Sequence, residues 1–171
     1  MSADLAELSS VERRLSESLP SVRGIVDEAV EGRIYRQYEQ VARAYGDLAA
    51  GGVAEATKRL VFLWWYSVAE PSYLSGIGRF PDDLSKQTVA MLRSVAAAGI
   101  DEEFKRMLAW YYTITDWYFE DLVPELVETF ARFAATTRGP DGSTDLSVVD
   151  TASDRGQMGA YFRAMRESQS G

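Results

Sequence analysis

Two carboxylates each close a run of aromatic and apolar residues, and they are the clearest candidates for chemistry in this chain. Glu70 ends the run WWYSVAE at 64–70, and Asp116 ends the run WYYTITD at 110–116. Two carboxylates brought together beside aromatic rings can act as general acid and base, or hold a divalent cation through oxygen. The alternative is that each carboxylate pairs with an arginine or caps a turn at the rim of the core.

Aromatic residues are concentrated in and around these two runs. More rings than one core layer can seal indicate an apolar ligand pocket or a protein interface, where Trp and Tyr act as anchors. The alternative is a large aromatic core whose Tyr hydroxyls reach the surface. The residues expected to line such a pocket, with the loop after Pro71 as its lip, are Trp64, Trp65, Glu70, Tyr73, Trp110, Tyr111, Asp116 and Trp117.

A local excess of acid follows the second aromatic run. Between positions 107 and 131 there are five acids and no basic residue. Such a stretch can present a surface to a basic protein or bind a cation, although a solvated helix face is the commoner explanation. The predicted acidic interaction surface consists of Glu120, Asp121, Glu125 and Glu128.

The composition limits the function classes. The 171 residues include no cysteine and no histidine, which removes disulfides, thiolate nucleophiles, the usual zinc sites and Ser-His catalysis. The formal charge of −8 disfavours nucleic acid and anionic membranes and favours a cationic partner. We predict no catalytic residue, no metal and no cofactor.

The N-terminal residues carry acids where a signal peptide has a basic start, and the most apolar run, 60–69, is too short to span a bilayer. With the absence of cysteine, this favours a cytoplasmic protein.

Helical periodicity dominates the sequence, so we predict an all-α fold, a compact bundle of five to seven helices. Ser9 and Glu12 have the spacing of a capping box, which predicts a helix start. Glu70–Pro71 and Gly99 are predicted helix ends, and Asp101 is a predicted N-cap. The stretch 102–120 is apolar nearly all round, which is typical of a central helix.

The two aromatic runs match at every position in size and chemistry, at an offset of 46 residues. We therefore predict two related helical hairpins, at about 33–70 and 82–119, within a helical domain spanning 1–135. Chance similarity between two aromatic helices is the alternative.

The C-terminal part differs in composition from the rest. Residues 136–154 are rich in turn formers, which predicts a linker or long loop, and 155–171 form a short amphipathic helix with a tail. Met158, Tyr161, Phe162 and Met165 are expected to dock on an apolar groove of the same domain, with a second copy of the chain as the alternative.

Two functions from different classes remain open at this level. The first is a non-catalytic interaction or regulatory protein that presents its acidic surface to a protein partner, as a single chain or as a homo-oligomer. The second is a small-molecule binding protein or cofactor-independent enzyme. Its pocket would lie between the two Trp/Tyr helices and carry Glu70 and Asp116.

Overall fold

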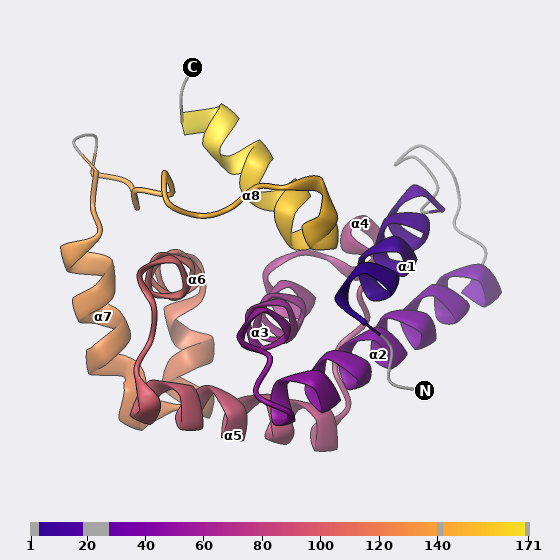
Figure 1. Ribbon diagram of the computed structural model, residues 1–171, viewed down its shortest axis with the longest axis horizontal. Coiled ribbons are helices and arrows are strands. Elements are labelled where there is room, and N and C mark those ends of the chain that lie inside the picture. The colour runs from indigo at the N-terminus through magenta and orange to yellow at the C-terminus, as the bar shows by residue number, and fades with distance from the viewer. Residues whose placement is uncertain (1–3, 19–27, 140–141, 170–171) are drawn as a thin grey trace.

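The computed structural model describes residues 4–18, 28–139 and 142–169, and in those ranges it is all-α, as predicted (Figure 1). An isolated β-bridge joins Arg138 and Thr144, and no strand forms in the described part of the chain. One of the helices, α4, is a single turn, and two short 3-10 turns, Pro124–Leu126 and Ser153–Arg155, accompany the others. The α-helices are α1 Leu5–Glu17, α2 Glu28–Ala50, α3 Ala54–Ala69, α4 Ser72–Ser75, α5 Asp82–Ala98, α6 Glu102–Leu122, α7 Val127–Thr136 and α8 Gly156–Gln169.

Local sequence signals explain several of the helix ends. Asp101 caps α6 by accepting a hydrogen bond from the Phe104 N–H at 2.7 Å, as predicted. Gly99 ends α5 with φ +115°, a conformation that favours glycine. The prediction for α1 is wrong, because Asp4 is its N-cap and accepts from the Glu7 N–H at 2.8 Å. Ser9 and Glu12 lie inside α1, and both are buried.

The middle of the bundle is occupied by α3, seen nearly end-on in Figure 1. Every residue from 56 to 65 is buried, including Lys58 and Arg59. The prediction that 102–120 is the central helix is therefore wrong. Helix α6 buries one broad face, but it also carries two exposed apolar residues. Ile114 is 43% exposed and Trp117 is 59% exposed.

The two predicted hairpins are not equivalent. Helices α2 and α3 pack along each other as a hairpin, whereas α5 packs against α2 and α3, and α6 packs mainly along α7 (Figure 1). Trp64 is fully buried and donates to Ser85 Oγ of α5 at 3.0 Å. Trp110 is only partly buried and donates to the Tyr161 hydroxyl of α8 at 3.0 Å. The matching runs thus belong to two aromatic helices in different surroundings.

The C-terminal part is held against the rest of the molecule. Leu146 and Val149, in the loop between α7 and α8, are both 1% exposed. Helix α8 buries Met158 and Phe162, and the Phe162 ring lies 6.3 Å from that of Phe62 in α3. The predicted docking on the chain's own domain is what the structure shows.

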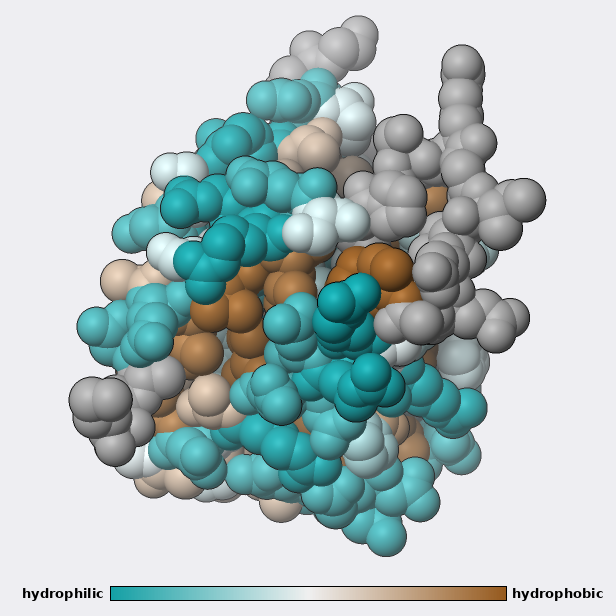
Figure 2. Space-filling view, turned by 90° about the vertical axis from the view of Figure 1, so that its right-hand side faces the viewer, coloured by the Kyte–Doolittle hydropathy of each residue, from teal (hydrophilic) through white to brown (hydrophobic). Residues whose placement is uncertain are grey.

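Figure 2 shows the side of the molecule on which α1 and the first half of α2 lie. Hydrophilic residues cover most of this face, and hydrophobic ones show at the bottom of a hollow between them.

Within the described ranges, no helix has both the length and the apolar character needed to cross a membrane.

Candidate functional site

The space between the two Trp/Tyr helices is filled by their own side chains. The rings of Trp65 and Tyr111 stack with centroids 4.3 Å apart and planes inclined by 20°. Trp65 donates its ring N–H to Thr115 Oγ1 at 2.9 Å. Trp64, Trp65 and Tyr111 are at most 1% exposed. These three predicted pocket residues are therefore part of the core, and no room for a ligand lies between them.

The other predicted pocket residues lie apart from one another. Glu70 is half-buried near Tyr161, whose pKa is raised to about 12 by burial and further by the Glu70 charge, against the hydrogen bond from Trp110. Asp116 is exposed and accepts from the N–H of Trp117 at 2.8 Å. None of the hollows described for the chain is lined by both Glu70 and Asp116.

All four predicted acidic-surface residues are exposed, but they are not equally available. Glu125 forms an ion pair with Arg93 of α5, which lowers the pKa of the Glu125 carboxyl. Glu120, Asp121 and Glu128 make no ion pair within the described residues. Of these, Asp121 lines one of the hollows found among the described residues.

That hollow, of about 490 Å³, lies between the end of α3, the start of α5 and the last turns of α6. It follows a kink in α6, where Thr115 leaves helical geometry with φ −138° and ψ 49°. Trp117 stands in its wall and is 59% exposed. We call this hollow the Trp117 groove, lined by Ser67, Val68, Arg79, Phe80, Asp82, Ser85, Trp117, Tyr118, Asp121 and Leu122.

Aromatic packing gives the Trp117 groove a firm base. The Tyr118 ring lies 4.8 Å from the buried ring of Trp64, and the Trp117 ring meets Tyr118 edge-on at 5.6 Å. Asp82 and Asp121, in the wall, are both exposed and make no ion pair in the described chain. The groove therefore combines a supported indole ring with carboxylates that lack a cationic partner.

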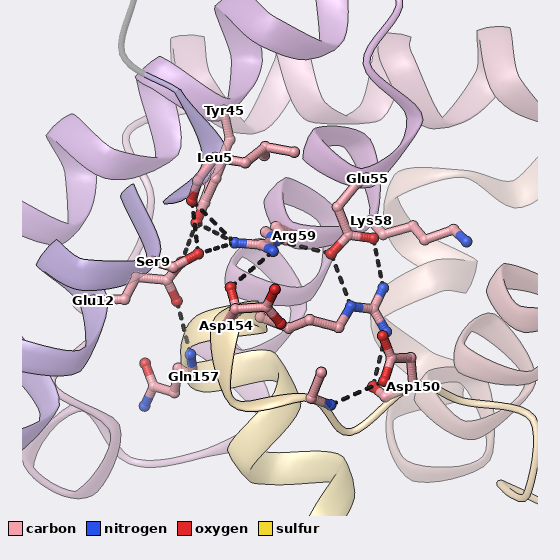
Figure 3. Close-up of polar contacts among 12 residues, drawn as sticks. Leu5, Ser9, Glu12, Tyr45, Glu55, Lys58, Arg59, Asp150, Asp154 and Gln157 are labelled. Atoms are coloured by element: carbon pink, nitrogen blue, oxygen red, sulfur yellow. Dashed lines mark hydrogen bonds and ion pairs between the residues drawn. The ribbon is translucent and has the colours of Figure 1, made fainter. Parts of the chain in front are cut away.

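A second charged region is buried beneath the C-terminal segment (Figure 3). We call it the buried polar network, formed by the side chains of Ser9, Glu12, Tyr45, Glu55, Lys58, Arg59, Glu103 and Arg155 together with the Gln157 backbone N–H. It joins α1, α2, α3 and α6 to the start of α8.

Glu12 is the most deeply buried acid of this network. Its carboxylate accepts from the Tyr45 hydroxyl and, at 3.0 Å, from the Gln157 N–H (Figure 3). Burial raises the pKa of Glu12 above its ordinary 4.5, although these two hydrogen bonds and the Arg59 charge act in the opposite direction. Glycine at position 156 is required beside it, since a Cβ there would lie 2.7 Å from the carboxylate.

Arg155 fixes the C-terminal segment. It contacts Glu55 at 2.6 Å and Glu103 at 2.5 Å, and donates to the Asp150 carbonyl at 2.8 Å. Glu55 also accepts from Arg59 at 2.8 Å. Burial raises the pKa of Glu55, but the hydrogen bonds from the two arginines outweigh it and leave the pKa below its usual value.

A hollow of about 350 Å³ adjoins this network, lined by Leu5, Ala6, Glu55, Arg59, Glu103, Asp150, Asp154 and Arg155. Its buried charged groups already contact one another, so the network serves to hold elements together. The sequence patterns do not predict this network. Arg155 stands at the junction of the predicted loop 136–154 and the predicted helix 155–171, 100 positions from its partner Glu55.

Among the described residues, no group of three or more acids is arranged to hold a metal ion. A comparison with protein-family models, curated proteins and solved structures finds no match to this chain. A function is therefore proposed from the geometry and the charge of the sites described above.

Proposed function

We propose that this protein is a non-catalytic interaction protein that receives a basic segment of a protein partner in the Trp117 groove. The observation that carries the proposal is the 59% exposure of Trp117 beside a groove whose wall holds two unpaired carboxylates. Exposed Trp residues supported by packed neighbours are typical anchors of protein interfaces. The apolar atoms of Val68, Phe80 and Leu122 suit one large apolar side chain of the partner.

Charge supports a basic partner over an acidic one. Asp82 and Asp121 lie in the groove, Asp116 and Glu120 lie one and three positions from Trp117 in the sequence, and the whole chain carries −8. Among the described residues that line the groove, Arg79 is the one cation. Complementary charge accelerates association and suppresses wrong partners, so the partner segment should carry Lys or Arg beside its apolar anchor.

We propose this groove, formed by the end of α3, the start of α5 and the last turns of α6, in place of the pocket predicted between the two Trp/Tyr helices. Two of the sequence-predicted residues, Trp117 and Asp121, belong to it, one from each predicted set. The remaining pocket residues either form the core or lie elsewhere on the surface.

Selection of random peptides displayed on phage tests this proposal. Peptides that bind the wild-type protein should be enriched in Lys or Arg next to a large apolar residue. Binding should weaken more than tenfold with Trp117→Ala and with Asp121→Lys, because truncating an interface anchor typically costs about 2 kcal/mol or more.

Two matched variants serve as controls. Tyr73 is 57% exposed on α4 and does not line the groove, so Tyr73→Ala should leave binding unchanged. Glu128→Lys makes the same charge reversal outside the groove. Selected peptides that bind Trp117→Ala as well as wild type, or a selection that yields no peptide, would contradict the proposal.

A further inference from the structure

A third hollow, of about 230 Å³, lies between α2 and the segment 77–81 that leads into α5. Its floor is apolar and buried: Tyr38, Ile77 and Phe80 are 1%, 0% and 8% exposed. Its rim carries two exposed arginines, Arg36 and Arg79. An apolar floor with a few polar groups at the mouth is the usual form of a small-molecule site. We call it the Tyr35 hollow.

The two arginines make no ion pair in the described part of the chain. The acid in the same wall, Glu39, is already held by Arg43 at 2.8 Å, and Arg43 also contacts Asp83 at 2.8 Å. The rim of the Tyr35 hollow is therefore locally positive in a chain of net charge −8. A guanidinium matches a carboxylate in shape and can bind it through two parallel hydrogen bonds.

Gly78 and Tyr35 form the side wall together. A Cβ at position 78 would lie 3.0–3.2 Å from atoms of the Tyr35 ring, so glycine lets this segment lie directly against the ring. The Tyr35 hydroxyl oxygen is buried and has no hydrogen-bond partner among the described residues. An apolar cavity of roughly 150 Å³ already accommodates benzene, so the Tyr35 hollow has room for one ring and a carboxylate.

We propose that the Tyr35 hollow binds an aromatic carboxylate, with its ring on the floor between Tyr35 and Phe80 and its carboxylate at Arg36 and Arg79. This site is distinct from the proposed partner groove, although the two share part of their walls. It touches that groove through Arg79 and Phe80, which line both hollows.

Titration of the full-length protein with benzoate, followed by backbone amide chemical shifts, tests the proposal. Benzoate should bind in the millimolar range and shift the amides of Ile77 and Gly78. Benzamide and acetate separate the contributions of charge and ring, since one lacks the charge and the other lacks the ring. Both should bind about tenfold more weakly than benzoate, or worse.

Arg36→Gln and Arg79→Gln should each weaken benzoate binding about tenfold. Arg132→Gln, an exposed arginine on α7, removes the same charge elsewhere and should change nothing. Because all three side chains are exposed, the variants are expected to fold. No shift at Gly78 in the millimolar range, or benzoate affinity unchanged in both rim variants, would overturn the proposal.

Discussion

In the buried polar network, Arg155 contacts two carboxylates and a carbonyl oxygen, and Glu12 accepts two hydrogen bonds. In the Trp117 groove, Asp82 and Asp121 contact no cation of the described chain. The two regions use the same residue types under different conditions. A buried charge without a partner costs several kcal/mol, so buried charges are paired within the fold. Exposed charges carry no such cost and remain available to a partner.

This comparison predicts that changes in the network affect stability, whereas changes in the groove affect binding. Arg155→Gln should have the largest effect on stability, because it leaves Glu55 and Glu103 without their shared cation. We expect a loss of about 3 kcal/mol in the free energy of unfolding, the lower end of the range for a broken buried pair, since Arg59 and Lys58 still contact the two carboxylates.

Urea denaturation followed by circular dichroism measures this loss. Arg163→Gln is the control. Arg163 is exposed and donates only to the Thr151 carbonyl among the contacts described for it, so its effect should stay below about 0.5 kcal/mol. Equal stability of the two variants would show that Arg155 does not anchor the C-terminal segment.

A pair of glycine variants gives the next largest effect. In Gly159→Ala, a Cβ would overlap the Ala152 carbonyl oxygen and push α8 away from the turn before it. We expect a loss of about 1–3 kcal/mol, as for other overpacked sites. Gly32→Ala, also within a helix, meets nothing closer than an Arg36 nitrogen at 3.6 Å and should gain about 0.5–1 kcal/mol. Thermal unfolding of both variants distinguishes close packing of α8 from a loosely attached helix.

The dependence of stability on pH separates two kinds of acid in the network. The pKa of Glu12 is raised in the folded state. Its contribution to the free energy of unfolding is therefore full at a pH below the ordinary pKa of 4.5, and it is lost as the pH rises through the folded pKa. The pKa values of Glu55 and Glu103 are lowered, so their contributions are present above 4.5 and lost on acidification.

Glu12→Gln isolates the first contribution. Relative to this variant, wild type should lose stability as the pH rises from about 4.5 toward neutral. Urea midpoints measured across that range test the sign. Parallel curves for the two proteins would show that Glu12 does not titrate differently in the folded and unfolded states.

The smallest expected effect links the two proposed sites. Because Arg79 lines both hollows, an aromatic carboxylate bound in the Tyr35 hollow should neutralise the one cation in the wall of the Trp117 groove. A selected basic peptide should then bind about twofold to fivefold more tightly in saturating benzoate, and benzoate should gain by the same factor. The Arg79→Gln variant should show no such coupling.

Local signals in the sequence were sufficient for the all-α class and for several helix ends, such as the cap at Asp101 and the stop at Gly99. They also predicted the docked face of α8. They failed where the deciding contact is distant in sequence. Ser9 and Glu12 have capping-box spacing, yet they face the network because Arg59 and the Gln157 N–H, 145 positions from Glu12, reach them there.

Periodicity also could not separate the buried aromatic residues from the exposed ones. Trp65 and Trp117 both belong to stretches that are apolar nearly all round, so helical spacing assigns neither of them a face. The kink at Thr115 and the packing of α6 along α7 determine that Trp117 points outward. Neither the kink nor this helix pairing has a recognisable local signature in these residues.

The most direct test of this division is an anisotropy titration of one phage-selected peptide against wild type, Trp117→Ala and Tyr73→Ala, with the unfolding free energy measured on the same samples. We predict that Trp117→Ala weakens binding more than tenfold while lowering the unfolding free energy by no more than about 1.5 kcal/mol, the cost of losing its edge-on contact with Tyr118, and that Tyr73→Ala leaves binding unchanged. Equal peptide affinity for Trp117→Ala and wild type would contradict the assignment of the groove as the binding surface.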